Sequence, residues 1–438
     1  MTTVRRRGVA AALAATAVLC AGGAAAVTAA PAAHAAPSPA ASSAAPVVPS
    51  GLYGRKDPTY DGVWRQSLAF MAQETSGVEP AGKAVAWLLG QQCDNGGFAS
   101  YRPDPAKPCD PAVPLDTNAT AVAVQALAGL DRPETEDGET DPVTKAVEAG
   151  TDWLTGVQNK DGGWSYNPGG PSDANSTSVV ISALAAAGGK PGDVRSADGR
   201  TPYDALLGFA IPCDAGTGAG AFAYQPDRNG ALVANADATA AAVLAGLGKH
   251  VQTRGVKPYQ PPVCEAAAKR TAERAARNGA AYLVTALAKS GHLDLPPMPG
   301  TATPAAPAPD FGNTADAVVA LGAAGHGDKA APALKWLQRN AVPWAEENGP
   351  AAWAQLIFAA HTLGADTRDF GGVDLVQRLN ATGPKPESTV ETRAQEEQEN
   401  KESGESSGFG VWLVVGIFLF AGMGIGFLIS GRNKNRQP

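Results

Sequence analysis

Four aspartates stand where apolar stretches of small residues begin, and they are the first candidates for chemistry: Asp116, Asp173, Asp237 and Asp310. An aspartate at a helix start accepts hydrogen bonds from the first backbone N–H groups, so helix capping is one interpretation. The other is a ring of carboxylates facing a central cavity. Two of them, with Asp116 and Asp173 as first candidates, would then act as catalytic carboxylates of a sugar-active enzyme.

A repeated aromatic pattern precedes three of these stretches, at 98–103, 164–168 and 222–226. Each copy has an aromatic residue, then a tyrosine and a proline, and each follows a glycine-rich turn. Tyrosine combines a rigid apolar ring with a hydroxyl, which suits the rim of a ligand site, although the motif could equally serve only to shape the loop. The predicted ligand-binding residues are Phe98, Tyr101, Asp116, Trp164, Tyr166, Asp173, Phe222, Tyr224, Asp237, Trp344 and Trp353.

The sequence contains no motif for a resident cofactor or metal. Its five histidines are scattered, and no C-x-x-C or Cys/His pair has the spacing of metal ligands. Four cysteines follow the N-terminal apolar run, and sequence proximity favours Cys93–Cys109, which leaves Cys213–Cys264 as the second disulfide. Disulfides are expected in a chain exported to an oxidising compartment, and each would contribute about 3 kcal/mol of stability.

Positioning these residues requires a repeated helical unit, which is clearest at 150–188, where an amphipathic helix, a Gly-Gly turn and a wholly apolar helix follow one another. A helix that is apolar all round is buried, so the second helix of each unit lies inside. We expect inner helices at 61–73, 116–129, 173–187, 237–248, 314–325 and 350–364. We expect outer helices at 79–92, 142–158, 201–211, 264–290, 328–340 and 370–381. In alternation they predict an all-α fold, an α6/α6 toroid.

The segments outside this domain predict export and anchoring. Residues 1–35 have the basic start, apolar run and small-residue cleavage site of a signal peptide, and a Pro/Ala-rich linker covers 36–50. The toroid spans 51–382 and is followed by an acidic, disordered stalk at 383–408. Residues 409–430 are apolar enough for a transmembrane helix, and 431–438 form a basic tail. The positive-inside rule places that tail in the cytoplasm and the toroid outside the cell.

The net charge of the 438-residue chain is −7, and no basic face with interleaved aromatic residues is present. Nucleic acid is therefore not an expected partner. The expected partners are a small-molecule ligand, the membrane through the C-terminal helix and a transporter complex.

The Gln-x-x-Asp-Gly-Gly-Trp/Phe turns, as at Gln158–Trp164, resemble the repeats of the prenyltransferase and squalene cyclase superfamily, which implies a terpenoid cyclase-like toroid. The D-x-D-D acid of squalene-type cyclases, the zinc-binding triad of protein prenyltransferases and the C-G-E-Q stretch of thioester domains are all absent from the sequence. The resemblance therefore implies the fold more strongly than any catalytic activity.

Within this superfamily the chain is similar to the toroid of the cobalamin carriers transcobalamin and intrinsic factor, whose inner helices open like Asp116–Thr120. This resemblance implies an exported, disulfide-bonded, non-catalytic binding protein, with a corrinoid as one ligand that it allows. The Ala/Gly/Pro-rich composition and the predicted span at 409–430 add the expectation of a bacterial cell surface. The expected function is to bind a small hydrophobic or amphiphilic ligand at the barrel mouth and to serve a membrane transporter. The alternatives are an enzyme of the terpenoid-cyclase fold, or a sugar-active one, that uses rim aspartates, and a non-binding structural or interaction toroid.

Overall fold

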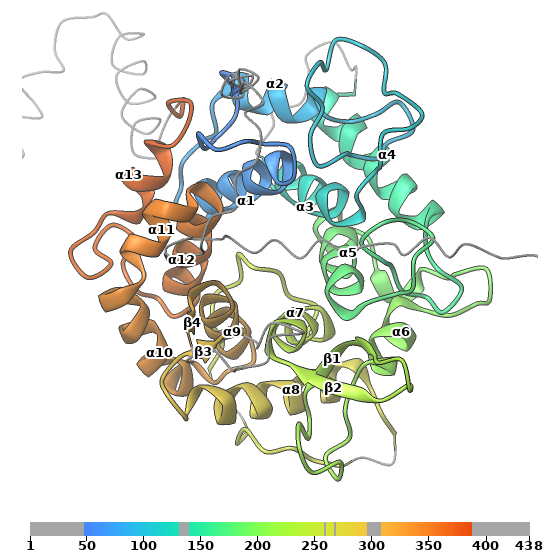
Figure 1. Cartoon of the computed structure of the whole chain (residues 1–438), viewed down its shortest axis with the longest axis vertical. Coiled ribbons are helices and arrows are strands. Elements are labelled where there is room, and N and C mark those ends of the chain that lie inside the picture. Colours follow the sequence, from blue (N-terminus) through green and yellow to red (C-terminus); the bar gives the residue numbers. More distant parts are fainter. Residues whose placement is uncertain (1–47, 131–139, 258–259, 267–268, 296–307, 388–438) are drawn as a thin grey trace, which may run out of the picture. The chain divides into compact units, whose positions relative to one another are not determined.

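The computed structural model describes residues 48–130, 140–257, 260–266, 269–295 and 308–387, all within one compact unit. These residues form thirteen α-helices, one short 3-10 helix and two small antiparallel sheets (Figure 1). The all-α prediction is therefore confirmed. Among the described residues, no helix is long and apolar enough to cross a bilayer. The predicted signal peptide, the span at 409–430 and the tail lie outside the described residues.

Six helices form an inner ring in which each helix packs against the next, and the last packs against the first (Figure 1). They are rich in Ala, Val, Ser and Thr, whose small side chains let neighbouring backbones approach closely, and most of their residues are buried. In ring order the inner helices are α1 (Gly62–Thr75), α3 (Thr117–Ala128), α5 (Ala174–Ala186), α7 (Ala236–Gly246), α9 (Phe311–Ala323) and α12 (Pro350–Thr362).

Six further helices alternate with these along the chain, and each contacts the inner helix of its own unit. The longer ones are amphipathic, with apolar residues toward the inner ring and charged residues toward solvent. These outer helices are α2 (Gly82–Gly90), α4 (Pro142–Gly156), α6 (Pro202–Gly208), α8 (Ala272–Leu287), α10 (Gly327–Asn340) and α13 (Leu375–Asn380).

Four of the six inner helices begin at side-chain caps. Asp116, Asp173 and Asp310 accept backbone N–H groups of the first turns of α3, α5 and α9, each contributing about 1 kcal/mol. Helix α7 differs, because Asn235 accepts from the Ala238 N–H at 2.8 Å. The expectation that Asp237 would start this helix was therefore wrong: it lies inside the first turn.

A threonine four residues after each of these four caps ties the preceding segment to the helix. The Oγ1 atoms of Thr120, Thr177, Thr239 and Thr314 accept backbone N–H groups at 2.8–3.1 Å, from Phe98, Trp164, Phe222 and Leu293 respectively. All four threonines are fully buried. The Asp-x-x-x-Thr opening is therefore structural, since it satisfies buried backbone groups that would otherwise lack acceptors.

The Gly-Gly turns need glycine for two reasons. Gly96 and Gly162 have φ of 91° and 93°, which other residues resist. A Cβ atom would also lie 2.1 Å from the Ala149 carbonyl oxygen at Gly96, and 2.2 Å from that of Thr201 at Gly162. Close packing against the next outer element therefore excludes a side chain at the first glycine of each pair.

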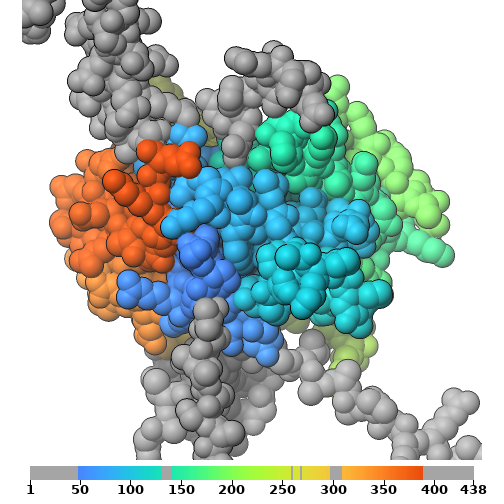
Figure 2. Space-filling model, turned by 90° about the horizontal axis from the view of Figure 1, so that it is seen from above, coloured from blue at the N-terminus to red at the C-terminus, as the bar shows by residue number. Residues whose placement is uncertain are grey.

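The two ends of the described chain meet and complete the ring. Gly54 N donates to Thr382 O at 2.9 Å, and the Tyr53 hydroxyl donates to Pro384 O at 2.9 Å. Figure 2 shows the blue N-terminal residues bordering the orange C-terminal ones. Glu387 also accepts from Gly82 N at 2.6 Å. The domain therefore extends beyond the predicted limit at 382, and residues 383–387 of the predicted stalk pack on it.

Several boundaries and small elements differ from the sequence-based expectations. Helix α8 begins at 272, where Thr271 is the cap, and α13 begins at 375, after the Asp374 cap, so both are shorter than predicted. Three small features were not predicted from the sequence: helix α11 (Val342–Asn348), the hairpin of β1 (Phe222–Pro226) with β2 (Leu232–Asn235), and the pair β3 (Leu293–Asp294) and β4 (Pro309–Asp310). Both predicted disulfides, Cys93–Cys109 and Cys213–Cys264, are confirmed, each with Cα atoms 5.6 Å apart.

Candidate functional site

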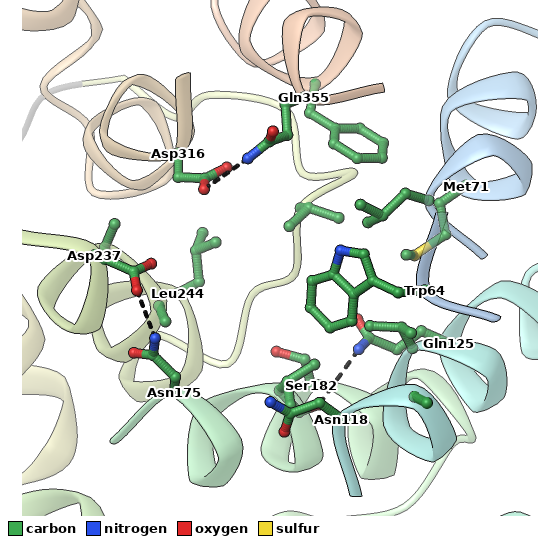
Figure 3. Close-up of a pocket in the computed structure, with 18 of the residues that line it drawn as sticks. Trp64, Met71, Asn118, Gln125, Asn175, Ser182, Asp237, Leu244, Asp316 and Gln355 are labelled. Atoms are coloured by element: carbon green, nitrogen blue, oxygen red, sulfur yellow. Dashed lines mark hydrogen bonds between the residues drawn. The ribbon is translucent and has the colours of Figure 1, made fainter. Parts of the chain in front are cut away.

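The inner ring encloses a cavity of about 530 Å³ to which all six inner helices contribute (Figure 3). Its size falls in the range of about 300–1,000 Å³ that is typical of small-molecule sites. The lining comprises Tyr60, Asp61, Trp64, Leu68, Met71, Ser100, Asp116, Asn118, Ala119, Val122, Gln125, Tyr166, Asn175, Val179, Ser182, Asp237, Ala240, Ala241, Leu244, Val251, Asn313, Asp316, Val319, Gln355 and Phe358.

The lining changes from polar to apolar along the inner helices. Near the helix starts it contains carboxylates, amides and tyrosines, such as Asp116, Asn175 and Tyr166. Further along the helices it is mostly aliphatic or aromatic, as at Leu244 and Phe358. The cavity therefore has a polar end and an apolar end.

The connection after α7 crosses the opposite end of the ring. The Gln252 amide donates to Met71 O at 3.2 Å in α1, and Ser182 in α5 donates to Lys249 O at 3.4 Å. Thr362 in α12 donates to Thr253 O at 2.9 Å, and Val251 lines the cavity. Residues 248–256 therefore form a floor beneath the apolar part, which the sequence analysis did not anticipate.

Helix periodicity explains which side chains face the cavity. Asn118, Asn175 and Asp237 each stand two residues after a cap, and Val122, Val179 and Asp316 stand six residues after one. Positions four apart lie on the same helix face, so α3, α5 and α7 present both positions to the cavity, and α9 presents the second.

Two cavity carboxylates are held by amides on neighbouring helices (Figure 3). Asp237 accepts from the Asn175 amide at 2.6 Å, and Asp316 accepts from the Gln355 amide at 3.0 Å. Both retain some surface toward the cavity but are enclosed by protein. Burial, followed by the neighbouring charge of Asp237, raises the pKa of Asp316 to about 7. Burial likewise raises the pKa of Asp237, against the Asn175 hydrogen bond. Asp316 can thus hold a proton near neutral pH.

The tyrosines of the aromatic motif connect successive units. The Tyr166 side chain is hydrogen-bonded to Asp116, which caps α3. The Tyr224 side chain is hydrogen-bonded to Asp173, which caps α5. Burial and the adjacent carboxylate raise the pKa of Tyr166 to about 12, so its hydroxyl remains a donor. Tyr101, at the corresponding place in the first unit, stacks on Trp87 with ring centroids 6.5 Å apart.

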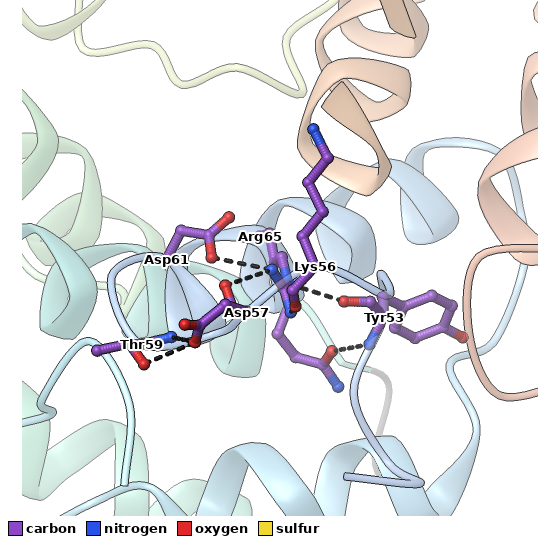
Figure 4. A network of polar contacts seen from close by, with 7 residues as sticks. Tyr53, Lys56, Asp57, Thr59, Asp61 and Arg65 are labelled. Atoms are coloured by element: carbon purple, nitrogen blue, oxygen red, sulfur yellow. Dashed lines mark hydrogen bonds and ion pairs between the residues drawn. The ribbon is translucent and has the colours of Figure 1, made fainter. Parts of the chain in front are cut away.

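A buried arginine fixes the segment that carries Tyr60 and Asp61 to the polar end (Figure 4). The Arg65 guanidinium donates to Tyr53 O at 2.9 Å, to Lys56 O at 2.8 Å and to the Asp61 carboxylate at 2.9 Å. Burial raises the pKa of Asp61, and the Arg65 charge opposes that shift. Tyr60 remains 78% exposed at the edge of the cavity.

Of the predicted ligand-binding residues, the structure brings Asp116, Tyr166 and Asp237 to the cavity. Phe98, Trp164, Phe222 and Trp353 are instead buried in the core, and Trp164 donates to Leu154 O of its outer helix at 2.7 Å. Asp173 is a buried cap, Tyr101 and Tyr224 brace neighbouring units, and Trp344 stacks on Phe311 with centroids 5.7 Å apart. None of these eight residues lines the cavity.

Three cavity residues were not predicted from the sequence: Trp64, Asp316 and Gln355. Asp316 had a readable signal, because it is the lone charge within the apolar run TADAVVALGAA. Among the described residues, no group of three or more His, Cys, Asp or Glu side chains is placed to hold a metal ion.

Comparisons with known proteins add little to this geometry. No protein-family model matches the chain, and no curated protein matches it. Among solved structures, one described as a protein from Actinoplanes is 17% identical, covers 68% of this chain and 100% of its own, and has a TM-score of 0.30. A likeness at this TM-score says nothing about the fold or the function of the chain.

Proposed function

We propose that the chain is an exported α6/α6 toroid of the terpenoid-cyclase type that binds a small amphiphilic molecule in its central cavity. The observation that supports this most directly is the 530 Å³ cavity with a polar end and an apolar end. Its aliphatic and aromatic side chains would bury a hydrocarbon body, and its amides and carboxylates would orient a polar group.

We further propose that the chain is a single-pass membrane protein, with the signal peptide at 1–35, the span at 409–430, the toroid outside and the C-terminus inside. The two disulfides support an oxidising compartment. In that setting the toroid would capture its ligand, a corrinoid being one candidate, and pass it to a membrane transporter.

The test is equilibrium titration of the full chain in lipid nanodiscs with cobalamin, a terpenoid alcohol and n-octanol, using empty nanodiscs to measure partition into lipid. Ala241 lines the cavity, so Ala241→Trp should take up part of its volume and weaken saturable binding. Ala215 is exposed on a loop away from the lining, so Ala215→Trp is the matched control. Absence of saturable binding by every probe would contradict the proposal and favour the structural or interaction role.

A second candidate function is an enzyme of this fold, terpenoid- or sugar-active, that uses Asp237 and Asp316 rather than Asp116 and Asp173. It is favoured by the raised pKa of Asp316, about 7, because a carboxyl that is protonated near neutral pH can act as a general acid. Such an enzyme should lose turnover in Asp316→Asn while a neutral ligand still binds. A binding protein should convert none of the probes.

A further inference from the structure

The acidic residues of the cavity differ in how many hydrogen bonds and ion pairs the protein itself supplies to each carboxylate. Asp61 is paired with Arg65 at 2.9 Å. Asp116 accepts two backbone N–H groups at 2.8 and 2.9 Å and the Ser100 hydroxyl at 2.9 Å, and it also bonds the Tyr166 hydroxyl. The hydrogen-bonding capacity of these two carboxylates is therefore already used by groups of the protein, so neither needs a ligand.

Asp237 and Asp316 are not satisfied in this way. Each accepts one side-chain amide, from Asn175 and Gln355 respectively, whereas a carboxylate has about four acceptor sites. The two residues lie on α7 and α9, which pack together, and no Lys, Arg or His is among the described lining residues. This wall of the cavity therefore holds two carboxylates without a cation.

A nearby amide adds to the excess of acceptors. The Asn175 NH₂ group donates to Asp237, which fixes the orientation of the amide and leaves its buried Oδ1 atom without a donor. The buried Oδ1 atom of Asn118, at the matching position of α3, also lacks one. Unsatisfied buried polar atoms are uncommon in folded proteins, and these two amide oxygens are both acceptors.

The repeats show that the fold itself does not require these charges. At the position of Asp237, the matching residues of α3 and α5 are the neutral amides Asn118 and Asn175. At the position of Asp316, the same helices carry Val122 and Val179. A carboxylate in an enclosed site without a paired cation is destabilising, so a role outside folding explains its presence better.

We propose that the ligand is a cationic amphiphile: a protonated amine whose N–H groups donate to Asp237 and Asp316, and whose hydrocarbon body lies along the apolar lining. This proposal rests on the proposed binding function and specifies its ligand class. An ammonium group supplies both the charge and the three hydrogen-bond donors that this wall lacks. The Trp64 indole lines the same cavity and adds to the aromatic surface available to the hydrocarbon body (Figure 3).

The experiment compares three probes with the same chain and different charge: n-octylammonium, n-octanol and octanoate. Each is titrated into the full chain in nanodiscs at pH 8, with empty nanodiscs as the reference. We expect octylammonium to bind at least about tenfold more tightly than octanol, and octanoate to bind most weakly, because enclosed charges are little screened by salt.

The variants Asp237→Asn and Asp316→Asn keep the size of each side chain and remove its charge. Each should weaken octylammonium binding about tenfold and leave octanol binding unchanged, which also shows that the variant is folded. Asp198 is exposed, has no hydrogen bond or ion pair among the described residues and lies outside the lining, so Asp198→Asn is the matched control.

The outcomes distinguish failure of the cationic-ligand proposal from failure of the proposed binding function. Equal binding of octylammonium and octanol, or a preference that survives both Asp→Asn substitutions, would overturn the cationic ligand and leave the binding function standing. Binding of none of the three probes would overturn the cationic ligand, and would overturn the binding function as well if cobalamin and the terpenoid alcohol also failed to bind.

Discussion

Replacing Asp316 by Asn should remove a specific pH dependence of stability. Burial and the charge of Asp237 raise the Asp316 pKa from 3.8 to about 7. Because this pKa is higher in the folded state than in the unfolded one, the folded chain keeps a proton that the unfolded chain has already released. Its contribution to stability is therefore present at low pH and is lost as the pH rises toward 7. Between pH 5 and pH 8 the loss is roughly 2–3 kcal/mol.

Urea unfolding of the full chain at pH 5 and pH 8 measures this effect. Relative to Asp316→Asn, the wild type should lose roughly 2–3 kcal/mol of unfolding free energy between the two pH values. Other groups with shifted pKa values, such as Glu74, titrate in both proteins and cancel in the comparison. The control Asp198→Asn should follow the wild type.

A result with parallel pH profiles for the wild type and Asp316→Asn would refute this reasoning. It would mean that the Asp316 carboxyl has an ordinary pKa, and hence that water or a cation reaches it freely. The argument for an enclosed, unpaired carboxylate in the cavity would then fail.

Three further substitutions test the fold that positions the site. Thr177→Val leaves the buried Trp164 N–H without its acceptor and should lower the unfolding free energy by about 1–3 kcal/mol in urea, whereas Thr177→Ser should stay near the wild type. Equal effects of Val and Ser would contradict a stabilising role of the hydrogen bond from Trp164 N–H to the Thr177 hydroxyl. Joint replacement of Cys93 and Cys109 by Ser should lower it by about 3 kcal/mol under non-reducing conditions, and an unchanged value would argue against this disulfide. Arg65→Lys cannot reproduce the forked contacts and should cost about 2 kcal/mol and expose residues 53–61 to protease; an unchanged cleavage pattern would count against this anchor.

The sequence predicted the helical class well because its signals are local. Wholly apolar stretches after an Asp or Gly-Gly turn indicate buried helices wherever they occur. Cys93–Cys109 followed from sequence proximity, and Cys213–Cys264 followed by elimination. Boundaries were less certain where a cap lay inside the predicted helix, as Thr271 does in the 264–290 segment. The α7 cap was misassigned because Asn235 and Asp237 are both good capping residues two positions apart.

The cavity was harder to predict because it depends on which face of each buried helix points inward. Aromatic residues such as Trp164 suggested a rim, but the turn directs that ring into the core, where its indole donates to Leu154 O. Asp316 could have been found as a charge in an apolar helix. Its partner Gln355 comes from another unit, and nothing local links the two.

The most direct measurement for the central claim is a crystal structure of the full chain with n-octylammonium bound. The account predicts the probe inside the inner ring, with its nitrogen within hydrogen-bond distance of Asp237 and Asp316 and its chain directed toward Leu244 and Phe358. A probe bound only on the outer surface, with the cavity occupied by ordered water alone, would contradict it.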